Sequence, residues 1–198
     1  SVKQINDETM HMLELAYENV NQAFDQLLQF SDKTDEQIYK REDTVNYLDK
    51  VISEYISTAL ATPNLNINIS QALSSYYLML VDIERISDYA VNMNHQATKR
   101  LQGDMTISEI EIVEHMKKLC VDMKNDLDDV EEAERKDDVI DSLVSSWREA
   151  QIQALKQKKC SSEVSMMLSR IFTDFERIND HALNVSQELD KITVEIPD

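Results

Sequence analysis

The chain has 198 residues, of which one is glycine and two are proline, and its formal net charge is −18 from 38 acidic and 20 basic side chains. So few turn-forming residues exclude a many-stranded β protein, and a single glycine excludes a glycine-rich phosphate-binding loop. The acidic balance disfavours nucleic acid and anionic membranes as partners, because both carry negative charge themselves.

Apolar residues recur at helical spacing along almost the whole chain, which predicts an all-α protein. A loop is expected over Thr62–Asn66, where proline and asparagine interrupt the pattern. We expect six long helices, at about 2–31, 35–61, 68–101, 106–132, 135–158 and 162–191.

Several residues mark the expected helix ends. Asp32 and Thr34 offer capping side chains before the second helix, and Thr106 with Glu109 forms a capping-box pattern before the fourth. Gly103 stands where a left-handed residue would end the third helix, and Pro197 falls in the tail.

The two halves of the chain repeat each other. Asp82–Asn92 aligns with Asp174–Asn184, with seven of eleven positions identical. Glu42–Asn46 aligns more weakly with Asp137–Asp141, and the two offsets, 92 and 95 residues, nearly agree. A near-constant offset indicates tandem duplication of a three-helix unit. The sequence therefore predicts two tandem three-helix bundles, at residues 1–102 and 103–198.

Four of the helices carry a pair of polar residues at positions i and i+4, on one helical face. Carboxylates so placed repel each other unless a cation or an arginine compensates them. Arg85 and Arg177 lie inside the repeated motifs, so a carboxylate–arginine network and a metal site both remain open. The pairs are Glu42/Asn46, Glu84/Asp88, Asp137/Asp141 and Glu176/Asp180.

The pair in the third helix also continues an apolar row. Glu84 and Asp88 follow Leu73, Tyr77 and Leu80 on one stripe, so we expect them to be half-buried and in need of partners. An oxygen-rich ligand set suits Mg²⁺, Ca²⁺, Mn²⁺ or iron better than a thiolate zinc site.

The other reactive side chains give weaker patterns. Glu8 and His11 form a single Glu-x-x-His, whereas a di-iron bundle needs two, so a di-iron carboxylate enzyme is the alternative of another class. Cys120 and Cys160 make no disulfide framework and indicate a reduced, intracellular protein. The longest apolar run, Tyr76–Val81, is far below the roughly 20 residues of a membrane span, so no membrane insertion of this segment is expected.

The segments Asp82–Asn92 and Asp174–Asn184 resemble the signature of the PhoU family of phosphate-transport regulators, which carry an acidic motif twice. The resemblance covers nearly the whole chain. It implies a cytoplasmic, non-catalytic role in phosphate uptake and, in some members, metal binding by the acidic motifs. The implied ligands are Glu84, Asp88, Glu176 and Asp180, with Glu42, Asn46, Asp137 and Asp141 as partners.

The chain departs from the family pattern at three positions. Ser87 and Asn179 replace the usual glycine, which changes the close packing there, and Asn46 stands where an acid is expected, so the two sites are not expected to be equivalent. The stretch Leu155–Cys160 is closer to the version fused to bacterial sodium/phosphate cotransporters, and the chain begins at Ser1.

We therefore expect the cytosolic domain of such a cotransporter, tethered to the membrane through an upstream segment. Its expected partners are the transporter membrane domain or other phosphate-transport proteins, and long amphipathic helices also allow a homo-oligomer. The alternatives are a stand-alone PhoU-type negative regulator of phosphate ABC transport and its sensor kinase, and a purely structural or dimerising domain. The acidic surface favours binding of phosphate through a metal.

Overall fold

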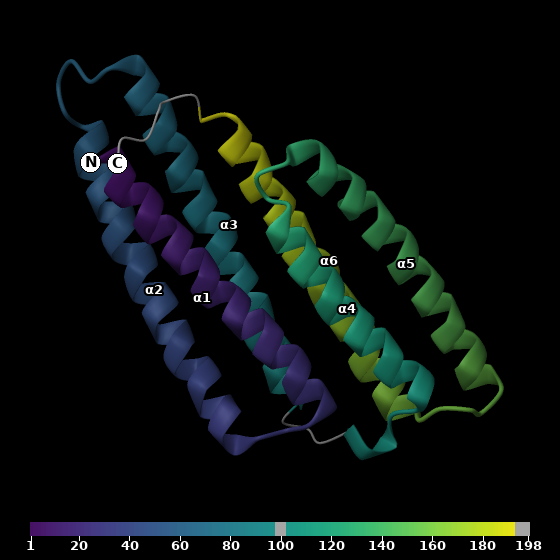
Figure 1. Cartoon of the computed structure of the whole chain (residues 1–198). Helices are drawn as coiled ribbons and strands as arrows, with labels where there is room; N and C mark the ends of the chain where they lie inside the picture. The colour runs from purple at the N-terminus through teal and green to yellow at the C-terminus, as the bar shows by residue number, and fades with distance from the viewer. Residues whose placement is uncertain (98–101, 193–198) are drawn as a thin grey trace.

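The computed structural model describes residues 1–97 and 102–192, and all regular structure in that part of the chain is helical. Consecutive long helices run in opposite directions (Figure 1). The elements are α1 (Val2–Leu28), α2 (Asp32–Leu60), α3 (Ile67–Ala97), the short 3₁₀-helix η1 (Gln102–Asp104), α4 (Ile107–Asn125), α5 (Val130–Lys156) and α6 (Ser162–Asp190). The predicted all-α class and the six long helices are confirmed.

The six helices form two three-helix bundles that lie side by side. The helices α1, α2 and α3 pack on one another, as do α4, α5 and α6 (Figure 1). Between the bundles, α3 packs along α6 and α1 along α4. The exact division at 102/103 stays a prediction, because it adjoins residues outside the described part.

Most helix ends fall within three residues of the predicted positions; the exceptions are the end of the fourth helix and the start of the fifth, which begins at Val130 and not at 135. The fourth helix ends at Asn125 and not near 132, because Asp129 caps α5 by accepting a hydrogen bond from the backbone N–H of Glu132. The predicted capping box of Thr106 and Glu109 is confirmed in both of its hydrogen bonds. Neither Asp32 nor Thr34 is the cap of α2: Ser31 accepts the N–H of Thr34 instead.

Gly103 does not have the backbone conformation that the sequence suggested. It lies in η1 and not at a left-handed helix end, and its φ is not positive. The described residues with positive φ are Asn64 at 60° and Lys158 at 54°, in the turns after α2 and α5. The expected end of the third helix at 101 and the expected tail position of Pro197 lie outside the described residues.

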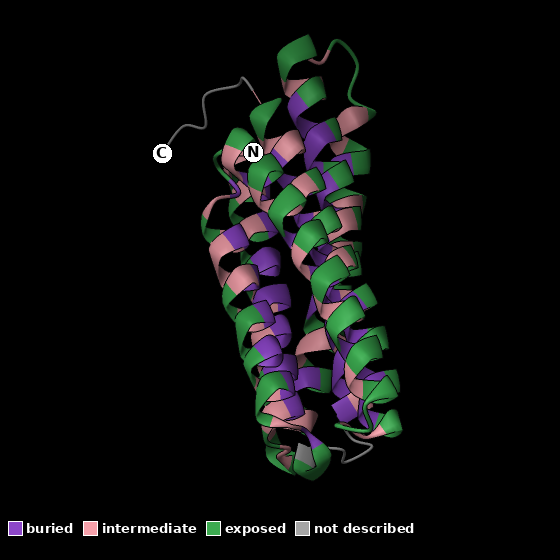
Figure 2. Ribbon diagram, turned by 90° about the vertical axis from the view of Figure 1, so that its right-hand side faces the viewer, coloured by how far each residue is buried: buried purple, intermediate pink, exposed green. Residues whose placement is uncertain are grey.

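The core runs the length of both bundles along the inner helix faces (Figure 2). Phe24 of α1 meets Phe175 of α6 edge to face, with ring centroids 6.4 Å apart, so the two bundles share apolar contacts. Cys120 is buried and Cys160 half-buried, and both are free thiols. No helix in the described part is both long enough and apolar enough to span a bilayer.

The repeats meet through equivalent residues. Tyr89 of α3 stacks on His181 of α6, with ring centroids 5.9 Å apart, and these two residues occupy the same position of the repeated motif. His181 also contacts Asp82 through Nδ1 at 2.8 Å, and Asn184 donates to the same oxygen at 3.1 Å. The antiparallel crossing of α3 and α6 at matching positions is what a pseudo-two-fold arrangement of two copies produces.

Candidate metal centre

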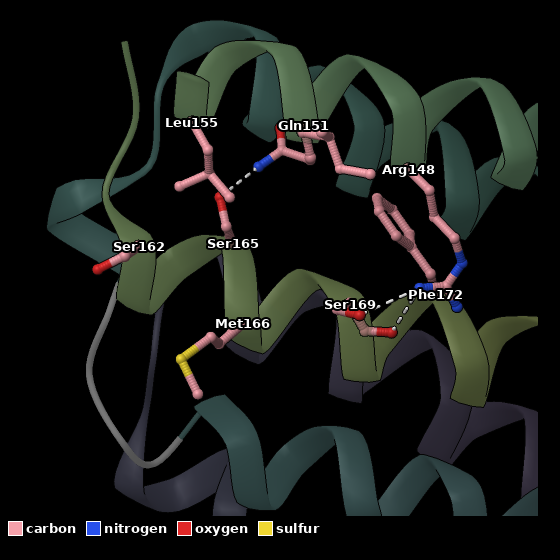
Figure 3. Close-up of a pocket in the computed structure, with 9 residues that line it drawn as sticks. Arg148, Gln151, Leu155, Ser162, Ser165, Met166, Ser169 and Phe172 are labelled. Carbon is pink, nitrogen blue, oxygen red and sulfur yellow. Dashed lines mark hydrogen bonds between the residues drawn. The ribbon is translucent and has the colours of Figure 1, made fainter. Parts of the chain in front are cut away.

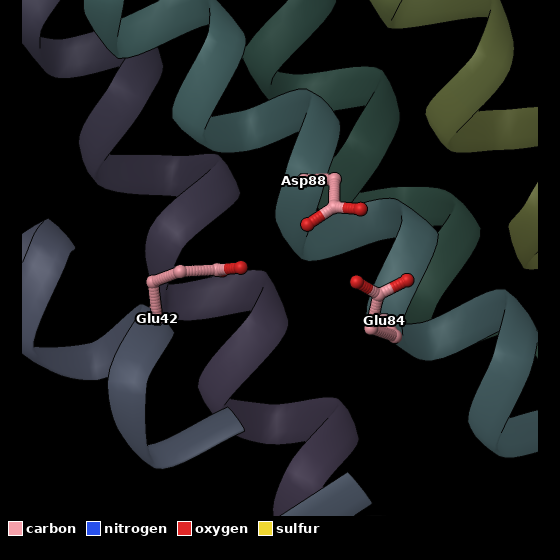
Figure 4. Close-up of side chains that lie close together, drawn as sticks. All are labelled: Glu42, Glu84 and Asp88. Carbon is pink, nitrogen blue, oxygen red and sulfur yellow. The ribbon is translucent and has the colours of Figure 1, made fainter. Parts of the chain in front are cut away.

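The first carboxylate cluster consists of Glu42 on α2 and Glu84 and Asp88 on α3. One carboxylate oxygen from each lies within 4.8 Å of the others, and all three side chains are half-buried (Figure 4). Glu84 and Asp88 share one face because they are one helical turn apart. Glu42 reaches them because α2 packs along α3.

Crowding and burial disfavour full ionisation of this cluster. Burial, and then the neighbouring Asp88, raises the pKa of Glu84 to about 7. Burial also raises the pKa of Glu42, although the hydroxyl of Ser87, which donates to its carboxylate, opposes the shift. Asp49, two turns after Glu42 on α2, has its pKa raised by burial and by the charge of Asp88. The first cluster therefore holds more negative charge than its surroundings compensate.

Arginine does not neutralise the first cluster. Within the described residues, none of Glu42, Glu84 and Asp88 forms an ion pair with Lys or Arg, and Arg85 is exposed. The carboxylate–arginine network that the sequence left open is therefore absent from this half.

The second carboxylate cluster consists of Asp137, Asp138 and Asp141 on α5. One oxygen from each lies within 4.8 Å of the others. Burial raises the pKa of Asp137 to about 7, with further contributions from the charges of Asp180 on α6 and Asp141. Burial and the charge of Asp141 likewise raise the pKa of Glu176. The two α6 carboxylates thus act on this cluster electrostatically while lying outside its tightest group.

Two features distinguish the second cluster from the first. Arg148 lies 3.7 Å from Glu176 and opposes the rise of its pKa, and Arg177 does the same for Asp180. In addition, Oδ1 of Asp137 is buried without a hydrogen-bond partner among the described residues. A buried oxygen of this kind is costly unless a ligand or cation meets it.

The donor set fits a hard cation. Both clusters offer carboxylate oxygens with raised pKa values, and the second offers the unpartnered oxygen of Asp137. Carboxylates close to one another are the ligands that Ca²⁺, Mg²⁺, Mn²⁺ and non-haem iron take. A bound cation would compensate the repulsion that the protein itself leaves.

The structure brings five of the eight predicted site residues into the two clusters and leaves three outside them. Glu42, Glu84 and Asp88 come together in one cluster and Asp137 and Asp141 in the other. Glu176 and Asp180 lie beside the second, and Asn46 is exposed, with a side chain close enough to Glu42 to lower its pKa.

Sequence reasoning missed four residues of the two sites. Asp49 lies seven residues after Glu42 on the same helical face, and Asp138 adjoins Asp137, so spacing carried a signal for both. The sequence pattern at Ser87 predicts only a change in packing, yet the buried hydroxyl of Ser87 donates a hydrogen bond to Glu42. Nothing in the spacing pairs Arg148 with Glu176, because that contact depends on how α5 packs on α6.

Histidine takes no part in either cluster of the described residues. His181 contacts Asp82 at the joint between the bundles, and His11 is exposed on α1. The histidine ligands of a di-iron carboxylate enzyme are therefore not brought to the clusters.

Two antiparallel three-helix bundles with a carboxylate cluster in each define a duplicated helical domain with two acidic sites. The PhoU domain family matches residues 9–97 and 107–189, one match for each bundle. The chain belongs to the PhoU domain family.

The relatives below are similar to this chain over nearly its full length. The chain is 23% identical over 197 residues to the phosphate-specific transport system accessory protein PhoU homolog 1 of Thermotoga maritima, covering 93% of this chain and 84% of that protein. Its fold matches the crystal structure of PhoU from Pseudomonas aeruginosa with a TM-score of 0.82 at 20% identity, over 96% and 95% of the two chains. The phosphate transport system regulatory protein PhoU from Streptococcus pneumoniae gives a TM-score of 0.84 at 19% identity, over 100% and 97%.

Proposed function

We propose that this protein is a non-catalytic, cytoplasmic regulator of phosphate transport whose two carboxylate clusters bind divalent cations or iron. The supporting observation is a carboxylate cluster in each bundle of a PhoU-family chain: the first is half-buried between α2 and α3, and the second lies on α5 beside Glu176 and Asp180 of α6. Helix packing alone does not require crowded acids twice. The partners in this proposal are other phosphate-transport proteins.

The relatives favour a stand-alone regulator over the cytosolic domain of a sodium/phosphate cotransporter. The relatives named above are described as accessory or regulatory proteins of phosphate transport systems. The match to the Thermotoga maritima protein extends over 84% of its length. The alternative of the sequence analysis is therefore the function we propose, with the cotransporter domain as the less supported version.

The carboxylates would hold the metal and keep it accessible. Glu42, Glu84 and Asp88 supply ligands in one bundle, and Asp137, Asp138 and Asp141 supply them in the other. A bound cation would provide a positive centre on an otherwise acidic surface, to which phosphate or a partner's acidic group can bind. Glu176 and Asp180 would add negative charge beside the second site.

A complementation assay tests this function. In a bacterium whose own PhoU is deleted, the wild-type chain is expected to restore normal control of phosphate uptake. The combined variant Glu84→Gln, Asp88→Asn, Asp137→Asn and Asp141→Asn is expected to fail while accumulating to the same level. Equal control by both proteins would mean that the clusters serve only folding. If the wild-type chain failed to restore control of phosphate uptake in its own source organism, the proposed regulatory role would be overturned.

A further inference from the structure

A groove runs between α5 and α6 at the end of the second bundle, distinct from the carboxylate clusters. It has a volume of about 340 Å³, and its walls include Ile152, Leu155, Met166 and Phe172 (Figure 3). We refer to it as the α5–α6 groove. Buried Gln151 closes its base by donating to Ser165 at 2.9 Å and to Glu109 at 2.8 Å. The groove therefore has an apolar rim above a base whose polar groups are hydrogen-bonded.

The first bundle fills the matching positions with large side chains. At the repeat offset of 92 residues, Ser165 and Ser169 correspond to Leu73 and Tyr77 of α3. At the offset of 95 residues, Gln151 corresponds to Ile56, which is fully buried. The groove therefore belongs to the second repeat alone and does not follow from the duplicated fold.

The rim exposes apolar side chains that the core does not use. Ile152 is 51% exposed, Leu155 38% and Met166 62%. In Figure 3 the side chain of Met166 lies on the side of α6 that faces away from α5, at the margin of the groove. Exposed apolar groups gathered on two neighbouring helices mark a surface that gains free energy when a partner covers it.

The connection between α5 and α6, beside the groove, carries charge opposite to the net charge of the molecule. The segment 150–162 contains three lysines and no acid, although the chain has 38 acids in 198 residues. Lys156 ends α5, Lys158 and Lys159 lie in the connection to α6, and all three are exposed. Arg148 lines the other part of the groove and is held by Ser169 and by Thr173 at 3.0 Å. The exposed positive charge beside the groove thus lies at its lysine end, because Arg148 pairs with Glu176 at 3.7 Å.

We propose that the α5–α6 groove docks an acidic amphipathic helix of a partner protein, whose apolar face covers Ile152, Leu155 and Met166 and whose carboxylates meet the lysines. Two neighbouring helical walls with an apolar rim form the kind of surface that helix-in-groove recognition uses. The partner's acidity follows from charge complementarity, since segment 150–162 holds Lys156, Lys158 and Lys159 and no acid. An anionic membrane would offer similar charge, but a body of net charge −18 opposes its approach.

The test measures binding of a defined probe to the full chain. The probe is a fluorescein-labelled helical peptide with leucine every third or fourth residue and glutamate on the flanks; its twin has lysine for each glutamate. We expect fluorescence anisotropy to show saturable binding of the acidic peptide and much weaker binding of the twin. The variant Lys156→Gln, Lys158→Gln and Lys159→Gln is expected to weaken binding about tenfold, since exposed charge pairs add up to about 1.4 kcal/mol.

A second variant tests the apolar rim. Met166→Lys is expected to weaken binding without changing the helix content, because Met166 is already 62% exposed. Val51→Lys is the matched control, since Val51 is 42% exposed in the separate groove between α1 and α2. No binding of the acidic peptide, or equal binding by all variants, overturns the proposal. So does preferential binding to phosphatidylglycerol vesicles, or self-association of the chain that Met166→Lys abolishes.

Discussion

Arg148 lies 3.7 Å from Glu176, and it is the only basic side chain in the described part of the chain that forms an ion pair with a carboxylate of either cluster region. It also donates hydrogen bonds to Ser169 and Thr173 and lies over the ring of Phe172, 5.5 Å from its centroid. The second cluster therefore has partial compensation within the protein, and the first has none. Both repeats carry a carboxylate cluster, but the first depends more than the second on a bound cation to compensate its negative charge.

The first prediction concerns this arginine. Arg148→Met is expected to lower the free energy of unfolding of the metal-free protein by about 1–2 kcal/mol, because it removes charge-assisted hydrogen bonds. Added Mn²⁺ is expected to stabilise this variant more than the wild type, since Glu176 then has no internal partner. Urea unfolding with and without Mn²⁺ measures both effects. Equal stabilisation of the two proteins by Mn²⁺ would show that Arg148 does not compensate the second cluster.

The second prediction concerns pH. The pKa values of Glu84 and Asp137 are raised to about 7 from ordinary values of 4.5 and 3.8. Between the ordinary and the raised values the folded protein binds more protons than the unfolded chain. The free energy of unfolding of the metal-free protein therefore falls as pH rises through this window. Thermal melts in chelator should give a higher Tm at pH 5 than at pH 8, and saturating Mn²⁺ should remove much of that difference.

The third prediction tests whether repulsion among the carboxylates of the first cluster, and not the net negative charge of the protein, destabilises the metal-free fold. Glu84→Gln is expected to stabilise the metal-free protein at pH 8 by about 0.5–1 kcal/mol, the scale of partly exposed charge interactions. Glu54→Gln makes the same change of charge at an exposed position of α2 and is expected to have little effect. Urea midpoints of the two variants in chelator give the comparison. Destabilisation by Glu84→Gln would show that Glu84 is compensated within the fold.

The fourth prediction concerns Ser87, whose hydroxyl donates to Glu42 across the α2–α3 interface. Ser87→Ala is expected to cost about 1 kcal/mol by removing this bond. Ser87→Gly, which restores the usual family residue, is expected to cost about 1 kcal/mol more, because glycine is poor in a helix interior. Ser74→Ala on the exposed side of α3 is the control. A pH titration followed by NMR should also find the Glu42 pKa higher in Ser87→Ala.

The local features of the fold could be predicted from the sequence. The Thr106 and Glu109 capping box depends on four neighbouring residues and is found as expected. The cap of α2 is wrong by one residue, because Ser31, Asp32 and Thr34 all have capping side chains and only packing decides among them. The sequence pattern predicts too long a fourth helix, because the acids after Asn125 continue the helical spacing. The turn before α5 depends instead on Asp129, which caps that helix.

The site was predictable to the extent that it is periodic. Glu84 with Asp88, and Asp137 with Asp141, share a helical face by spacing alone, and the structure places them in the clusters. Contacts between helices carry no such signal. The contact of Ser87 with Glu42 depends on how α2 packs on α3, and that of Arg148 with Glu176 depends on the rotation of α5 against α6. Gly103 is a wrong indicator of a left-handed helix end: its φ is not positive and a side chain there would meet open space, so neither the backbone conformation nor the packing requires glycine.

Metal analysis of purified protein tests the central claim most directly. Chelator-treated protein is dialysed against Mn²⁺ or, without oxygen, Fe²⁺, then desalted and measured by elemental mass spectrometry. We expect metal to remain bound, with Glu84→Gln plus Asp88→Asn removing one part of it and Asp137→Asn plus Asp141→Asn removing the other. Asp43→Asn plus Glu54→Gln, at exposed positions of α2, should keep all of it. Wild-type protein that retains no more metal than the variant lacking both clusters would contradict the account.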